Sequence, residues 1–211
     1  MNKYLNKEKI FLIINILIII TGIIILCTMG FNKSIEYRAG TRIEVYIPQS
    51  YEKQDITDIV YESFSDTDFL IEDIEKLNQV AGIRISSYTE EELNNLKTNI
   101  SEKYEIEEDK LEIYEIKLPT TRISTVIKPY IFPVVLVTVL SLIYVLFRNL
   151  KSENKWKKLL NILLTILSIL GVYFSLILIL RLPFGTFTMP LALTIYITTL
   201  IILVSNIKKN K

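Results

Sequence analysis

Two chemically versatile residue types are almost missing from this chain of 211 residues, which has no histidine and a single cysteine, Cys27. The lack of histidine excludes His-based acid–base catalysis and His metal ligation. One cysteine excludes an intramolecular disulfide and a Cys metal site. The sequence also contains no glycine-rich phosphate loop and no acidic residues at metal-ligand spacing. We therefore expect no catalytic residues, no cofactor and no bound metal, and we expect that the protein is not an enzyme.

Charged residues are absent from four long apolar runs, which cover residues 10–29, 129–147, 159–180 and 186–207. Each run has about 20 residues, enough to cross a hydrocarbon core of roughly 30 Å as a helix. Buried helices of a soluble protein seldom run so long without a charge. Because lipid offers no partner for backbone N–H groups, the four runs predict a membrane α-helical bundle of four transmembrane helices.

The first run also has a feature of secretory signal peptides, because three lysines precede it. Its apolar stretch is longer than that of a signal peptide, and no small-x-small cleavage site follows it. A lipoprotein anchor on Cys27 is disfavoured, since the bulky Ile25 and Leu26 precede the cysteine. We interpret the run as an uncleaved first helix.

The charges that remain are divided unevenly along the chain. Residues 30–127 hold 11 basic and 21 acidic residues, a net charge of −10, whereas the rest holds 13 basic and 2 acidic residues. The basic residues outside 30–127 lie mainly at the N-terminus, in 148–158 and at the C-terminus. The positive-inside rule places these three regions in the cytoplasm. An acidic outer domain also argues against nucleic acid as a partner, because a phosphate backbone binds basic surfaces.

This distribution predicts a multi-pass protein of the cell membrane with both termini in the cytoplasm and its acidic domain outside. The expected organisation is a cytoplasmic N-terminus (1–9), transmembrane helices (10–29, 128–147, 159–180 and 186–207), an extracytoplasmic domain (30–127), a basic cytoplasmic loop (148–158), a short outer loop (181–185) and a cytoplasmic tail (208–211).

The acidic segment alternates patterns of strand and helix. Alternating apolar residues predict strands at 41–47, 80–88 and 110–118. Apolar residues at helical spacing predict helices at 55–64 and after Thr89, where Thr89 and Glu92 form a capping box. Residues 68–79 fit a strand or a helix. Taken as a strand, this segment completes the order β-α-β-β-α-β, which predicts an α+β ferredoxin-like domain.

A turn of specific composition lies just before the first expected strand, at Glu36, Tyr37, Arg38, Ala39, Gly40 and Thr41. It resembles the acidic-aromatic-x-Gly-Gly-Thr turn that leads into the first periplasmic domain of the SecD and SecF protein-export subunits. Ala39 replaces the first glycine of that pattern, and Glu36 replaces the usual aspartate. The layout of one helix, a small βαββαβ domain and closely spaced helices is similar to that of SecF.

The position of the turn between a membrane helix and a sheet predicts roles for three of its residues. We expect Gly40 to supply unusual backbone dihedral angles where the chain enters the sheet. We expect Glu36 and Arg38 to anchor the domain near the lipid headgroups. The alternative is that these are ordinary charges next to a membrane.

The chain departs from the SecF pattern in two ways. SecF-type subunits have six membrane helices, whereas four are predicted here. Their fourth helix carries an Asn-Asp pair within the membrane and an Asp-Arg pair near its end, where this chain has Ile201, Ile202, Lys208 and Lys209. None of the four runs contains a carboxylate. Because proteins that move protons keep ionisable groups in the membrane despite their cost, we predict no proton relay in this chain.

Small and hydroxylated residues recur along the expected membrane helices. Such residues allow close helix approach and hydrogen bonds between helices. They predict either packing within the bundle or docking onto a partner membrane protein, and the candidates are Asn15, Gly22, Thr165, Ser168, Gly171, Ser175, Thr194 and Thr198. We expect Pro133 and Pro190 to kink their helices, and Pro129 and Pro183 to mark the ends of spans.

Three functions remain open at this point. The resemblance implies a SecF-like subunit of, or accessory to, the Sec export machinery. Its expected partners are the lipid bilayer, a SecD-like subunit or the Sec translocation channel, and translocating polypeptide. One alternative is a membrane-anchored extracytoplasmic binding or sensory module unrelated to export. The other is a remnant of a longer subunit.

Overall fold

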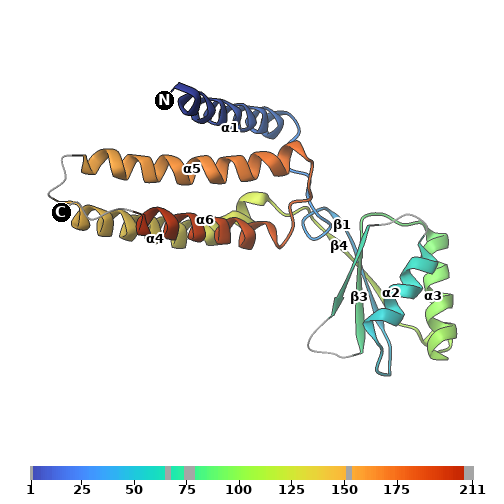
Figure 1. Cartoon of the computed structure of the whole chain (residues 1–211). Coiled ribbons are helices and arrows are strands. Elements are labelled where there is room, and N and C mark those ends of the chain that lie inside the picture. Colours follow the sequence, from blue (N-terminus) through green and yellow to red (C-terminus); the bar gives the residue numbers. More distant parts are fainter. Residues whose placement is uncertain (1, 65–67, 74–78, 151–153, 207–211) are drawn as a thin grey trace. The chain divides into compact units, whose positions relative to one another are not determined.

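The computed structural model describes residues 2–64, 68–73, 79–150 and 154–206, and the chain divides into two compact units (Figure 1). One, the helical unit, comprises Met1–Lys33 and Ile123–Lys211; the other, the α/β domain, is Ser34–Arg122. Parts of three predictions lie outside the described residues: part of the ambiguous segment (74–78), part of the basic loop (151–153) and the tail with Lys208 and Lys209.

The α/β domain consists of an antiparallel sheet and two α-helices. The strands are β1 (Gly40–Tyr46), β2 (Phe69–Asp73), β3 (Val80–Ile85) and β4 (Ile113–Leu118), and the order across the sheet is β2-β3-β1-β4. Helix α2 (Lys53–Ser63) follows β1, and α3 (Glu90–Tyr104) follows β3. A short 3-10 helix, η1 (Glu108–Lys110), precedes β4. Figure 1 shows α2 and α3 together on one side of the sheet.

Alternation along the strands builds the core of this domain. Ile43 and Val45 of β1 and Ile83 and Ile85 of β3 are fully buried, and the apolar faces of α2 and α3 pack against them. The residues between them point to the opposite face of the sheet because successive strand side chains alternate. One sheet face is therefore covered by helices, and the other is left open.

The structure confirms the elements that the alternation predicted, with shifts at their ends. The Thr89–Glu92 capping box is present, with the Glu92 N–H donating to Thr89 Oγ1 over 3.2 Å. The ambiguous segment forms a strand over its described residues. Strand β3 ends at Ile85, three residues before the predicted end of that strand.

Four helices of the helical unit are long and apolar enough to cross a membrane, in keeping with a multi-pass membrane protein. They are α1 (Asn2–Thr28), α4 (Ile123–Arg148), α5 (Lys155–Ile179) and α6 (Thr188–Ser205). Helix α5 packs against α1 and against α6, and α4 lies beside α6 (Figure 1).

Two expectations about proline are wrong. Helix α4 begins at Ile123, so Pro129 lies inside the helix and does not mark its start. The first turns of the helix contain the polar residues Ser124, Thr125 and Lys128, so the apolar run begins later than the helix. Pro190 lies in the first turn of α6, where a missing N–H removes no helical hydrogen bond, so it has no reason to kink the helix.

Candidate functional site

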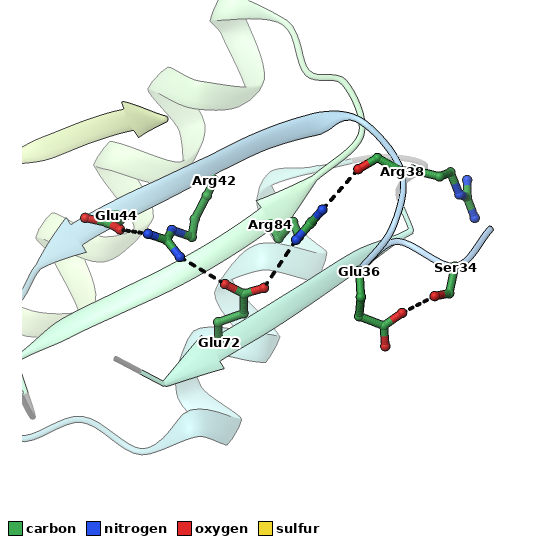
Figure 2. Close-up of polar contacts among 7 residues, drawn as sticks. All are labelled: Ser34, Glu36, Arg38, Arg42, Glu44, Glu72 and Arg84. Carbon is green, nitrogen blue, oxygen red and sulfur yellow. Dashed lines mark hydrogen bonds and ion pairs between the residues drawn. The ribbon is translucent and has the colours of Figure 1, made fainter. Parts of the chain in front are cut away.

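Four charged side chains gather on the open face of the sheet: Arg42 and Glu44 of β1, Glu72 of β2 and Arg84 of β3 (Figure 2). We call these four residues the open-face cluster. Strand register explains why they meet. Arg84 is paired with Arg42, while Gly82 is paired with both Glu44 and Glu72. Because Gly82 has no side chain, the centre of the face is free for the long side chains around it.

The cluster is held by a chain of ion pairs. Arg42 Nη2 lies 2.7 Å from Glu44 Oε1, and Arg42 Nη1 lies 3.4 Å from Glu72 Oε2. Glu72 Oε1 lies 3.8 Å from Arg84 Nη1. The four side chains are 11–31% exposed, which means that they lie flat against the sheet. Ion pairs shielded in this way are stronger than fully exposed pairs but lose more solvation.

The two arginines nevertheless retain donors without an acceptor. The Nε atoms of Arg42 and Arg84 are buried and have no hydrogen-bond partner. A buried donor without an acceptor costs stability, on the order of 1–3 kcal/mol. The open face therefore carries a charge-balanced cluster that encloses two buried N–H groups without an acceptor.

The turn at residues 36–41 joins the ends of all four strands. The Arg38 C=O accepts a hydrogen bond from Arg84 Nη2 (3.0 Å), and Arg38 Nη2 pairs with Asp68 Oδ2 (2.7 Å) just before β2. The Tyr37 C=O accepts hydrogen bonds from Thr121 N (3.0 Å) and Thr120 Oγ1 (3.1 Å), just after β4. The turn thus fixes where the chain enters and leaves the domain.

The remaining residues of the turn stay inside the same unit. The Ser34 hydroxyl donates a hydrogen bond to the Glu36 carboxylate (Figure 2). Thr41, the second residue of β1, lies opposite Ile85 on one side and Lys117 on the other. Glu36 bonds to Ser34 and Arg38 pairs with Asp68, both within the α/β domain, and anchoring at lipid headgroups stays a prediction.

Gly40 is required for a different reason from the one expected. Its φ angle is not in the left-handed region, whereas that of Gly30 is +66°. A Cβ atom on Gly40 would lie 2.4 Å from the backbone oxygen of Ile85. The glycine therefore allows β1 and β3 to approach at the end of the sheet, and the expectation of unusual dihedral angles is wrong.

The structure brings together some of the predicted helix-packing residues. Gly22 is buried against α5, and a Cβ atom there would lie 2.3 Å from Ser175 Oγ. Gly171 faces α1, where a Cβ atom would lie 3.3 Å from Ile19 Cδ1. Asn15 is half-buried on α1. Gly22, Ser175 and Gly171 therefore lie in the contact between α1 and α5.

The other candidates do not join this contact. Ser168, Thr194 and Thr198 are exposed, and Thr165 is half-buried. The hydroxyls of Thr165 and Thr194 donate to carbonyls of their own helices, at Asn161 and Pro190. Their spacing predicted a packing face, but a hydroxyl group can instead donate a hydrogen bond to a backbone carbonyl of its own helix.

One cluster that the sequence analysis missed lies where α1 ends. Arg181 Nη1 donates to the Gly30 C=O (2.9 Å), and Asn32 Nδ2 donates to the Arg181 C=O (2.9 Å). The Phe184 ring is fully buried and contacts the Phe31 ring at a tilt of 59°, with centroids 5.0 Å apart. Arg181, a single charge between two apolar runs, was the available signal.

A second missed feature is a polar contact between α4 and α6. The buried Tyr196 hydroxyl lies 2.7 Å from Thr138 Oγ1 and donates to the Val134 C=O (3.1 Å). Tyr196 also lines an apolar cavity of about 180 Å³ between α4, α5 and α6. Tyrosine within an apolar run was the only signal, and the sequence does not show which helix it meets.

The fold and contacts define a class: four helices of membrane length with an inserted α/β domain that presents a charged, open sheet face. Among the residues that the structure describes, no group of three or more His, Cys, Asp or Glu side chains lies close enough to hold a metal ion. A scan of protein-family models finds none that matches this chain, and a search of curated proteins finds no match. The resemblance to SecD and SecF therefore stays a prediction from the residues of the turn.

Proposed function

We propose that the protein is a SecF-like membrane subunit of, or accessory to, the Sec protein-export machinery. The observation that carries this proposal is the turn at residues 36–41. Its residues match the export-subunit pattern at Tyr37, Gly40 and Thr41, and its contacts reach the ends of all four strands. A motif with that structural task is a stronger basis for the resemblance than composition alone.

The arrangement of the α/β domain supports this proposal. The elements follow the order β1-α2-β2-β3-α3-β4, the sheet order is β2-β3-β1-β4, and all neighbouring strands are antiparallel. We infer a ferredoxin-like fold from this order together with the placement of both helices on one face. Because such a fold serves many functions, it supports the layout and not the activity.

The proposed orientation follows from charge. Both termini lie in the cytoplasm of a cell whose membrane the four helices cross, and the acidic α/β domain lies outside. Protease added to intact spheroplasts tests this orientation. We expect cleavage within the α/β domain without lysis. Cleavage only after lysis would contradict the orientation and the export proposal.

In this function the helices supply packing and the α/β domain supplies binding. No Asp or Glu lies within the four candidate spans, so proton coupling, if the complex uses it, comes from a partner. The open-face cluster supports a bound polypeptide on this face, because its four partly exposed charged side chains offer partners to polar groups of another chain.

In-cell photocrosslinking tests the proposed partners. A crosslinking residue at Leu70, beside Arg84 on the open face, is compared with one at Asn95, which is exposed on α3. We expect crosslinks from Leu70 to a SecD-like subunit, to the translocation channel or to exported polypeptide, and few from Asn95. Crosslinks to an unrelated complex would favour the membrane-anchored binding or sensory module.

A further inference from the structure

Strand β4 lies at one edge of the described sheet, with β1 on its inner side. Tyr46 N donates to the Glu112 C=O over 3.0 Å, which sets the phase of the ladder. Since hydrogen-bonding residues alternate along an antiparallel strand, Tyr114 and Ile116 direct their backbone groups toward β1. Glu115 and Lys117 therefore direct theirs outward, toward the free edge.

The side chains along this edge are exposed and mixed in character. Tyr114 and Ile116, on the open face, are 58% and 37% exposed. Glu115 and Lys117 are exposed on the opposite face, which holds the helices. Charged residues on an edge strand usually prevent pairing with other chains. Here the two charges have opposite signs and lie two residues apart, so they can attract the same segment of a second copy.

Antiparallel pairing of β4 with itself has few possible registers, and charge separates them. A two-fold axis at Ile116 places Glu115 of each copy opposite Lys117 of the other, Tyr114 opposite Leu118, and Ile116 opposite itself. An axis at Glu115 or at Lys117 places like charges opposite each other, which is destabilising. An axis at Tyr114 places Glu115 opposite Ile113 and leaves both charges without a counterpart.

The backbone agrees with the register centred on Ile116. Glu115 and Lys117 both point their N–H and C=O groups outward, so each Glu115–Lys117 pair can exchange its two backbone hydrogen bonds. Pro119 would lie opposite Ile113 and has no N–H, which stops the new ladder at that end. Ile116 would form a pair without hydrogen bonds, in which Cα atoms lie about 4.5 Å apart.

We propose that β4 is a self-association edge, and that two copies of this chain pair through it in the register centred on Ile116. The interface is short, so it is a transient one. The net charge of −10 on residues 30–127 of each copy opposes it, but repulsion is largely screened beyond about 8 Å at physiological salt. Confinement in one membrane raises the effective concentration. The proposal does not depend on the export function.

Disulfide trapping of the full-length chain tests the register directly. The natural Cys27 is replaced by Ala, and Ile116→Cys is compared with Tyr114→Cys under mild oxidation in isolated membranes that contain the full-length chain. The Cys residues of Ile116→Cys fall within disulfide range, whereas those of Tyr114→Cys lie about 14 Å apart, beyond the limit of roughly 7 Å.

We expect a covalent homodimer from Ile116→Cys and little from Tyr114→Cys. No dimer from Ile116→Cys, or equal dimer from both variants, would overturn the proposal. A product in which Ile116→Cys is linked to another membrane protein and not to itself would show that the edge takes a different strand, and would overturn the proposal as well. These variants change no charge, so the result does not depend on the charge variants below.

Charge reversal tests the Glu115–Lys117 pairs. In the Ile116→Cys background, Glu115→Lys or Lys117→Glu alone places like charges opposite each other. We expect each variant to reduce the amount of dimer by at least about fivefold. The double variant Glu115→Lys/Lys117→Glu restores opposite charges and is expected to restore the dimer. Since Tyr88 donates a hydrogen bond to Glu115, Tyr88→Phe is the matched control, which removes that bond and keeps both charges.

The double variant also separates loss of pairing from loss of folding. Recovery of the dimer shows that neither single reversal acts by unfolding the domain. If the double variant keeps the circular dichroism spectrum of the parent and yet gives no dimer, the register is wrong. If the single reversals leave dimer formation unchanged, the charge pairs do not form.

Discussion

An isoleucine in the core of the α/β domain and one on the surface of α1 have opposite surroundings. In the α/β domain Ile43 and Ile83 have no exposed surface, whereas Ile24 of α1 is more than half exposed. Water drives the first pair into a core. Many apolar side chains on the four helices of membrane length remain exposed on the helix surface, as a lipid environment permits. Different forces therefore stabilise each unit internally. The α/β domain depends on burial, and the helical unit depends on close backbone approach and a few polar contacts.

Truncating matched isoleucines breaks this comparison most strongly. We expect Ile83→Ala to destabilise the α/β domain by about 3–4 kcal/mol, because it leaves a cavity in a closed core. Ile24→Ala is the control, with an expected change below about 0.5 kcal/mol, since its side chain is not packed in a core. Hydrogen exchange by mass spectrometry on β1 and β3 peptides measures both variants. Equal loss of protection would show that the two units do not differ in this way.

Gly40→Val is the next largest change. The new side chain would collide with the Ile85 carbonyl, and we expect a loss of about 3 kcal/mol and weaker partner crosslinking. Ala39→Val is the matched control, because Ala39 is exposed and adjacent. Exchange at the paired ends of β1 and β3 reports the effect. Unchanged protection and partner association in Gly40→Val would count against a role for this close approach.

In the helical unit, Gly22→Val tests the close contact of α1 with α5. The added side chain meets both the side chain and the backbone of Ser175, so α1 must move, and we expect a loss of about 2 kcal/mol. Thr198→Val, at an exposed position of α6, is the control. Thermal unfolding in detergent compares the two variants. If they behave alike, α1 is not held through Gly22.

Tyr104→Phe is the smallest change and has the opposite sign. The Tyr104 hydroxyl is buried without a hydrogen-bond partner, so its removal is expected to stabilise the α/β domain by about 1 kcal/mol. Tyr88→Phe, which loses a bond to Glu115, is the control and is expected not to stabilise. Hydrogen exchange on α3 peptides measures the difference, and destabilisation by Tyr104→Phe would contradict the expectation.

The same tyrosine gives a pH dependence. Burial, and then the negative charge of Asp55, raise the pKa of Tyr104 to about 12. The folded domain keeps the proton that the unfolded chain releases near pH 10, so the free energy of unfolding falls between pH 10 and 12. This fall is expected to be smaller in Tyr104→Phe. Part of the fall remains in this variant, because the pKa of Tyr88 is also raised to about 12, mainly by its hydrogen bond to Glu115.

Local patterns predicted most of the fold. Alternation at Ile43 and Ile83, helical spacing at Ile56 and the capping box at Thr89 each depend on neighbours in sequence. Helix ends were less predictable. Apolar runs mark the stretch that suits lipid, and α4 extends beyond that stretch through polar residues such as Ser124.

The candidate site depended on contacts that sequence patterns do not contain. The open-face cluster forms because β1, β2 and β3 align Arg42, Glu72 and Arg84 around Gly82, and that register appears only in the folded sheet. Arg181 and Gly30 are likewise distant in sequence and adjacent in the structure. For Gly40 the residue was identified correctly but the reason was not, because its close neighbour is a carbonyl 45 residues further along the chain.

The hydrogen bonds from Thr120 and Thr121 to the Tyr37 carbonyl bring the two ends of the α/β domain to one point. When the two ends of a domain lie close together, recombination can remove or exchange the domain, and a few residues suffice to join the flanking chain. The flanking helices would then keep their connection whichever module is carried between them. This geometry favours replacement of the α/β domain by another domain.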